Sequence, residues 1–104
     1  MTTYTRRVDQ WIQIGRDIRV MPTDIDPAGI RLLVKGRVMG GSHDGEPFEN
    51  AYELLVGQDA HLGPHLVINI VEIRGDSVRL GVLAPANIPI YTKEQIDELR
   101  KGNS

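Results

Sequence analysis

The sequence predicts a mostly β domain of small antiparallel hairpins that ends in one short helix. Three observations lead to this fold class: apolar residues come in short runs rich in Val, Ile and Leu, turn residues separate these runs, and helix signals gather near the C-terminus. Many short strands joined by regular turns are typical of a domain built from hairpins.

Six short runs are predicted strands, because each is rich in branched aliphatic residues and lies between turn signals. They span residues 11–14, 18–20, 30–34, 66–71, 78–82 and 88–91. Residues 39–47, rich in Gly, predict a flexible loop. The segment 48–56 fits either periodicity: Phe48, Tyr52 and Leu55 suit a helix, whereas every second residue from Tyr52 to Val56 is apolar, as in a strand.

The helix is predicted from Thr92 to Lys101. Thr92 and Gln95 form a capping-box pattern, in which each residue satisfies a backbone N–H near the other. Ile96 and Leu99 lie three residues apart and share one helical face. Gly102 is a suitable stop.

The composition limits the class of protein. The chain has 104 residues, enough for one domain, and no cysteine, so neither disulfides nor a thiolate metal site is expected. No apolar run suits a signal peptide or a membrane span, so we expect a cytoplasmic protein. The net charge of -2 argues against a general polyanion binder. The acidic residues concentrate in the middle: residues 21–71 hold three basic and seven acidic residues, whereas the rest of the chain holds nine basic and seven acidic.

An internal repeat is visible, since residues 18–34 align without gaps on residues 66–82. Identical pairs are Ile25/Ile73, Arg31/Arg79, Leu32/Leu80 and Val34/Val82. Upstream, residues 14–17 resemble residues 56–59, with a six-residue gap following. Both copies predict strand, turn, strand. Duplication and the pattern common to any two β-hairpins both explain this similarity.

Two segments resemble the carbon storage regulator family, small bacterial proteins of the CsrA and RsmA kind. The first segment is Tyr4-Thr5-Arg6-Arg7-Val8 and its continuation from Trp11 to Ile18. The second runs from Val71 to Val82 and continues with Ala84-Pro85 and Ile88-Pro89-Ile90. The chain is therefore interpreted as one CsrA-like domain over residues 1–104, with residues 21–65 as an insert or a duplicated hairpin.

The resemblance implies a mostly β fold ending in a helix, usually an interlocked homodimer, and binding of messenger or small regulatory RNA at loops containing GGA. The family's RNA surface joins the first strand of one subunit to the last strand of the other. The matching residues here are Thr5, Arg6, Arg7, Arg79, Ala84, Pro85, Ile88 and Ile90.

One departure from the family pattern falls at the end of the last strand. The family has His-Arg-Glu there, and its arginine is central to RNA binding, whereas this chain has Tyr91-Thr92-Lys93. Lys93 replaces that arginine only after a one-residue shift, and lysine lacks the planar fork of guanidinium. Tyr91 suits either stacking on a base or covering the core.

Arg6 and Arg7 are adjacent in the first predicted strand, so their side chains point to opposite faces. We expect one of these two arginines to bind an RNA phosphate and the other to pair with a carboxylate. Charges that protect an edge strand are the alternative explanation.

No catalytic or metal-binding pattern is present. His61 and His65 are four residues apart, but Gly63 and Pro64 oppose a helix and a third ligand is lacking. Neither a serine–histidine pair nor paired carboxylates suit catalysis, so the sequence predicts no enzyme and no cofactor.

The leading hypothesis is a bacterial, CsrA-like post-transcriptional regulator that alters translation or message stability by covering GGA. The alternative is a protein-interaction module on the same fold that has lost RNA binding, which the departure at Thr92 and the acidic middle favour. The resemblance also implies a protein antagonist of the FliW type. Pro22 predicts a poor central strand, so we expect a homodimer in which residues 39–65 project as an acidic accessory element.

Overall fold

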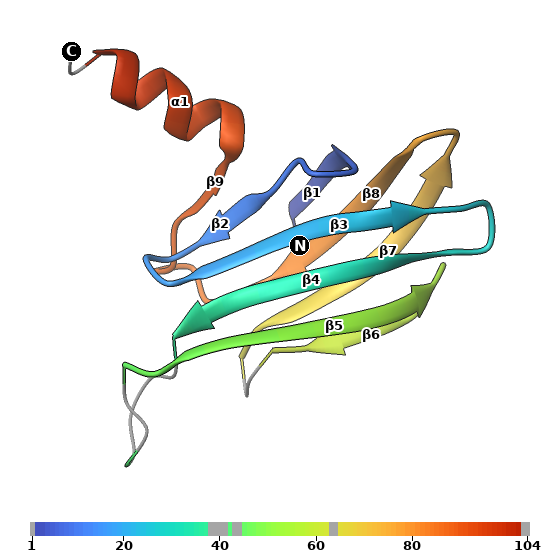
Figure 1. The fold of residues 1–104 in the computed structure, drawn as a ribbon, viewed down its shortest axis with the longest axis horizontal. Coiled ribbons are helices and arrows are strands. Elements are labelled where there is room, and N and C mark those ends of the chain that lie inside the picture. Colours follow the sequence, from blue (N-terminus) through green and yellow to red (C-terminus); the bar gives the residue numbers. More distant parts are fainter. Residues whose placement is uncertain (1, 38–41, 43–44, 63–64, 103–104) are drawn as a thin grey trace.

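The chain forms two antiparallel sheets and one helix. The computed structural model describes residues 2–37, 42, 45–62 and 65–102, with side chains up to Leu99. The strands lie in two layers, and α1 projects from the end of β9 away from both layers (Figure 1). Most of the predicted loop over residues 39–47 lies outside the described residues. No helix in the described part is long and apolar enough to cross a membrane. The mostly β fold with a C-terminal helix is confirmed.

The first sheet has four strands in the order β1-β8-β7-β6. All neighbouring strands in it are antiparallel. Their bounds are β1 Thr2–Arg7, β8 Ser77–Leu83, β7 Val67–Arg74 and β6 Asp59–His61. The first strand of the chain therefore pairs with β8 of the same chain.

The second sheet has five strands in the order β5-β4-β3-β2-β9. Their bounds are β5 Pro47–Leu55, β4 Gly29–Arg37, β3 Ile18–Ile25, β2 Ile12–Ile14 and β9 Ile90–Thr92. The helix α1, Lys93–Gly102, follows β9 directly. The ambiguous segment 48–56 is thus a strand through Leu55.

One apolar core lies between the two layers, because each strand turns every second side chain inward. The core side chains are the branched aliphatics that predicted the strands, and each stabilises the fold by about 1.5–3 kcal/mol through burial. The fully buried aliphatic residues are Ile12, Val20, Leu32, Ile68, Ile70, Val78 and Leu80.

The two halves of the chain repeat one pairing scheme with a constant shift of 48 residues. Val20 pairs with Val34 in β3 and β4, and Ile68 pairs with Val82 in β7 and β8. The shift extends to the outer strands, where Tyr4 pairs with Leu80 and Tyr52 pairs with Leu32. The register irregularities also correspond, between Pro22 and Asp24 and between Ile70 and Glu72.

The turns after β1 and β5 are also related by the shift of 48 residues. Asp9 and Gly57 have positive φ, 68° and 88°. The Gln10 side chain accepts the Arg7 N–H at 3.0 Å, and the Gln58 side chain accepts the Leu55 N–H at 2.8 Å. The predicted match of residues 14–17 with residues 56–59 is therefore wrong. Residues 56–58 correspond to residues 8–10, without a gap.

Pro22 does not keep β3 at an edge, so that prediction is wrong. β3 lies between β4 and β2. Proline lacks the N–H that a regular ladder requires, but a bulge follows Pro22 and relieves that requirement. The Pro22 carbonyl still accepts a hydrogen bond from the Asp9 N–H at 2.9 Å.

The acidic middle does not project as an accessory element, and that prediction is also wrong. Residues 47–55 and 59–61 are the strands β5 and β6, each paired within a sheet. The sequence did not predict β6, because Asp59-Ala60-His61 has one apolar residue and no visible alternation. Ala60 is buried in the core.

Thr92 caps α1, as predicted, and is also the last residue of β9. The Thr92 hydroxyl accepts the Gln95 N–H at 3.2 Å, and the Gln95 side chain accepts the Thr92 N–H at 2.8 Å. This is the reciprocal capping box.

We expect Thr92→Ala to lower the free energy of unfolding by about 0.5–2 kcal/mol, because the Gln95 N–H loses its partner. Urea denaturation measures this change. Thr92→Ser, which keeps the hydroxyl, is the control. Equal stability of the Ala and Ser variants would show that the cap contributes nothing.

Candidate nucleic-acid interface

The outer edge of one sheet meets the outer edge of the other where β1 approaches β9 and α1. Arg6, on β1, donates a hydrogen bond through Nη1 to Oε2 of Glu94 at 2.8 Å. Glu94 lies in the first turn of α1, directly after β9. This ion pair therefore joins the first strand to the helix that directly follows the last strand.

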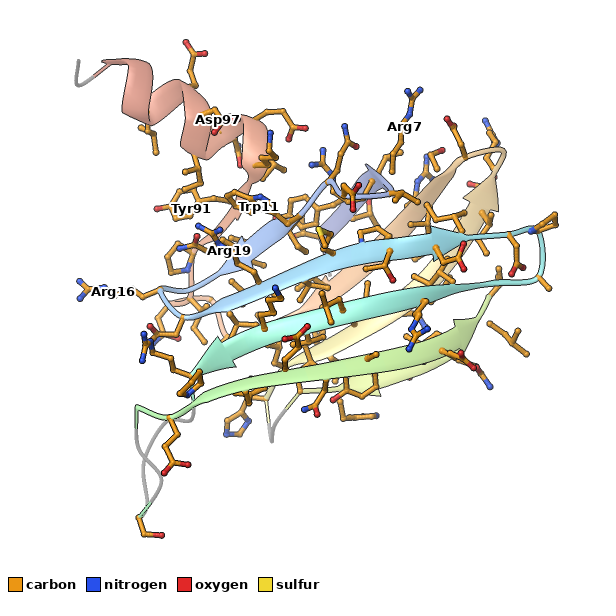
Figure 2. All side chains as sticks on the ribbon, in the orientation of Figure 1. Arg7, Trp11, Arg16, Arg19, Tyr91 and Asp97 are labelled. Atoms are coloured by element: carbon orange, nitrogen blue, oxygen red, sulfur yellow. The ribbon has the colours of Figure 1, made fainter. Side chains whose placement is uncertain are left out.

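The side chains of β1 alternate as predicted. Arg6 turns toward Glu94 at the start of α1, and only 12% of its side chain is exposed. Thr5 and Arg7 point outward and are exposed. Figure 2 shows Arg7 extending away from the sheets. Of the two arginines, Arg6 makes the short contact with a carboxylate, whereas the nearest carboxylate oxygen to Arg7 is 3.8 Å away on Asp76.

Two exposed cations share the outward face of the four-stranded sheet. Arg79 lies directly opposite Thr5 across the β1–β8 ladder, and Arg7 is two residues further along β1. Their ion pairs are long: 3.8 Å from Arg7 to Asp76 and 3.8 Å from Arg79 to Glu72. Exposed pairs of this kind contribute little, so both guanidinium groups remain accessible to a phosphate.

A shallow groove with a volume of about 280 Å³ lies near the start of β1, on the face opposite to these two cations. Tyr4 lines it from β1, and four of the predicted site residues line it from the other side, namely Ala84, Pro85, Ile88 and Ile90. The sequence predictions did not include Tyr4 or Glu94 in the site. The alternation of β1 is the signal that places Tyr4 beside Arg6 on the inward face.

Lys93 does not occupy the position of the missing arginine. Its Nζ lies 3.4 Å from Oδ2 of Asp97, one helical turn along α1. Thr92 is engaged in the cap of the same helix. The end of β9 therefore presents a neutral residue at the place where the family has a cation.

The other half of the chain has no comparable surface. With the shift of 48 residues, Thr5, Arg6 and Arg7 correspond to Glu53-Leu54-Leu55 on β5. Beside β5 lies β6, and among the described residues no strand pairs with the outer side of β6. The described structure holds one such surface, between β1 and β9.

The guanidinium of Arg6 lowers the pKa of the Glu94 carboxyl below its ordinary value of 4.5, mainly through the hydrogen bond between them. The folded state therefore holds this proton less tightly than the unfolded state does. The contribution of the ionised Glu94 to the free energy of unfolding is complete above about pH 4.5 and is lost as the pH falls through the lowered pKa.

We expect Glu94→Gln to flatten the acid side of the stability–pH profile, by less than about 1 kcal/mol because 54% of the Glu94 side chain is exposed. Urea denaturation between pH 3 and pH 6 measures this effect. Glu98→Gln, an exposed helix carboxylate, is the control. Identical profiles for both variants would contradict a role for Glu94.

The histidines form no metal site in the described part of the chain. Within it, no group of three or more His, Cys, Asp or Glu side chains is placed to hold a metal ion.

Exposed arginines grouped on one face of a small β domain are one feature found in proteins that bind nucleic acid. Residues 55–101 match the CsrA model, described as the global regulator protein family. Over these 47 of the 104 residues, the resemblance to the carbon storage regulator family is confirmed. The match does not extend to Thr5, Arg6 and Arg7.

Curated relatives agree with the family match. The chain is 38% identical over 48 residues to the translational regulator CsrA of Brachyspira hyodysenteriae, which covers 46% of this chain and 58% of that protein. It is 50% identical over 36 residues to the protein of the same name from Rhodopirellula baltica, 35% of this chain and 51% of the relative. It is 37% identical over 46 residues to the translational regulator CsrA of Treponema pallidum, which covers 44% of this chain and 63% of that protein. The chain thus spans about half to two thirds of each of these relatives. No solved structure matches at a significant level.

Proposed function

We propose that this protein is an RNA-binding regulator that binds GGA-containing loops through the surface between β1 and β9, and so alters translation or message stability. The contact between Arg6 and Glu94 carries the proposal, because it holds the first strand against the start of the helix that directly follows the last strand. The similarity to translational regulators supports it.

The chemistry of the surface suits an unpaired loop. Arg7 and Arg79 are exposed and bind phosphates, which gives affinity without reading sequence. Bases splayed from a loop reach round the edge of β1 into the groove beside Tyr4, where backbone N–H and C=O groups along Ala84 to Ile90 read guanine edges. When the GGA lies near the ribosome-binding site of a message, the bound protein then excludes ribosomes from that site.

We also propose that residues 21–65 belong to a duplicated set of strands, not to an insert. The constant shift of 48 residues in pairing, bulges and turns supports this. Each half then supplies the strands that a second subunit supplies in the family.

The structure removes one premise of the predicted homodimer. That prediction assumed that the first and last strands pair across chains, whereas β1 pairs with β8 and β9 pairs with β2 within one chain. We expect a monomer of 11.6 kDa. Light scattering at micromolar concentration measures the mass, and a mass of two chains would restore the homodimer.

RNA binding is tested by gel-shift titration with a GGA hairpin and with the same hairpin carrying CCU in its loop. We expect binding of the GGA hairpin alone. Arg7→Ala/Arg79→Ala should weaken it and lower the slope of log affinity against log salt by about 0.7 for each phosphate that the variant no longer binds.

Arg31→Ala is the matched control. Arg31 corresponds to Arg79 in the other half and pairs with Glu53 where Arg79 pairs with Thr5. Its replacement should leave RNA affinity unchanged. Equal affinity of the Arg7/Arg79 double variant and the native protein would refute the site.

A protein-interaction module is the second candidate. Leu55 and Val56, at the positions that correspond to Arg7 and Val8, are 53% and 49% exposed. Such an apolar pair suits a protein partner, for example an antagonist of the FliW type. Failure of the folded protein to bind the GGA hairpin would favour this candidate.

A further inference from the structure

The outward face of the five-stranded sheet carries a second group of cations, away from Arg7 and Arg79. Across the ladders, one row runs from Tyr91 through Gln13 and Arg19 to Lys35. Directly paired residues point to the same face of a sheet, so these side chains are neighbours. Arg37 is two residues beyond Lys35 on that face, and Arg16 lies in the turn between β2 and β3.

We call Arg16, Arg19, Lys35 and Arg37 the cationic face. All four residues are exposed, and they line one shallow groove with a volume of about 460 Å³. Among the described residues, Asp17 is the single acidic one that lines it, and neither Arg16 nor Lys35 forms an ion pair with any of them. Glu49 lies directly opposite Lys35 on β5, so the four cations of this face stand against two carboxylates, although the whole chain is net acidic.

Aromatic rings border the cationic face. The guanidinium of Arg19 lies 4.2 Å from the centroid of the Trp11 ring, and its Nε donates to the Gln13 side chain at 3.4 Å. Figure 2 shows Trp11, Arg19 and Tyr91 together beside β2, with Arg16 at the same end of the sheet. Stacking on Trp11 fixes the Arg19 guanidinium while leaving the residue exposed.

The fold itself does not require these charges. Arg19 and Lys35 correspond to Val67 and Leu83, which pair with each other in the same way in the other sheet. Arg37 corresponds to Pro85, and Trp11 corresponds to Asp59. The same backbone thus holds a cationic, aromatic surface in one half and an apolar one in the other.

We propose that the cationic face binds the single-stranded RNA that flanks the loop, with phosphates on its four cations and a base stacked on Tyr91. This inference extends the proposed function, since it takes the bound RNA beyond the surface between β1 and β9. The two surfaces meet at β9: Ile90 lines the groove beside Tyr4, and Tyr91 is the first residue on the other side of that strand. Alternating aromatics and cations are how proteins hold single strands without reading sequence.

The test compares three RNAs by gel shift: a bare GGA hairpin, the same hairpin with ten-nucleotide unstructured flanks, and an unstructured strand without GGA. We expect the flanks to raise the affinity of the native protein by about 5- to 30-fold. Arg16→Gln/Lys35→Gln should abolish this gain and leave the affinity for the bare hairpin unchanged. Neither residue belongs to the first surface.

The matched control is Leu55→Glu/Val56→Glu, which changes the net charge by the same amount at half-exposed positions at the end of β5 and in the turn that follows it. It should keep the gain from the flanks. Tyr91→Leu should reduce the gain, whereas Tyr91→Phe, which retains the ring, should restore it.

The outcomes separate the two proposals. This inference is overturned if the flanks do not raise the affinity of the native protein, even if the hairpin binds. It is also overturned if Arg16→Gln/Lys35→Gln keeps the gain in affinity from the flanks. If the native protein binds the unstructured strand but not the hairpin, and Arg16→Gln/Lys35→Gln loses that binding, the result supports the cationic face and refutes GGA recognition. A folded protein that binds none of the three RNAs overturns both proposals.

Discussion

An RNA with two GGA hairpins is expected to bind two chains of this protein, with no more than a twofold statistical gain in affinity over an RNA with one. The described residues of each chain hold one surface between β1 and β9, because the corresponding positions on β5 are Glu53-Leu54-Leu55. A binder with two sites gains roughly 10²- to 10⁴-fold when both engage one RNA, and that gain should be missing here.

Native mass spectrometry measures the stoichiometry, and gel-shift titration measures the affinity. The control RNA keeps both hairpins but carries CCU in one of the loops. A complex of one chain with the two-hairpin RNA, at least a hundredfold tighter than the control, would mean two sites per chain. A complex of two chains with the same gain would point to a dimer.

Leu32→Ala and Leu80→Ala are each expected to lower the free energy of unfolding by about 2–5 kcal/mol, a large part of the stability of a domain of this size. Both side chains are completely buried, and they occupy corresponding positions of β4 and β8 in one core. Because the two sheets share that core, truncation in either half should destabilise the whole chain in a single transition.

Urea denaturation followed by far-ultraviolet circular dichroism and by Trp11 fluorescence measures this effect. Leu55→Ala, at a half-exposed position, should cost much less. Separate transitions for the two signals in Leu80→Ala would contradict a shared core, since Trp11, the single tryptophan, reports on the other half.

The parts of the fold that were predictable are those set by neighbouring residues. The hairpin turn Arg74-Gly75-Asp76-Ser77 and the capping box at Thr92 each lie within a few residues, so their chemistry is visible in the sequence. β6 was not predictable, because three residues with one apolar side chain carry no periodicity. The position of Pro22 depended on a bulge that the sequence does not reveal.

For the candidate site, the contact between β1 and the start of α1 was not predictable. Arg6 and Glu94 are 88 positions apart, and no local pattern relates them. The stacking of Arg19 on Trp11 likewise depends on where the segment before β2 lies relative to β3. Such contacts form only when the strands assemble into sheets and the sheets pack, so they are not visible in the order of residues.

The register shared by the two halves has a consequence for how this protein can change. In an assembly of identical subunits, every substitution appears on both sides of the symmetry axis, so a harmful effect on one side cannot be separated from a useful effect on the other. Here each half has its own codons. Arg19 and Lys35 can differ from Val67 and Leu83, and Thr5 can differ from Glu53, although the backbone pairing is the same. One half is free to specialise while the other keeps the structure intact.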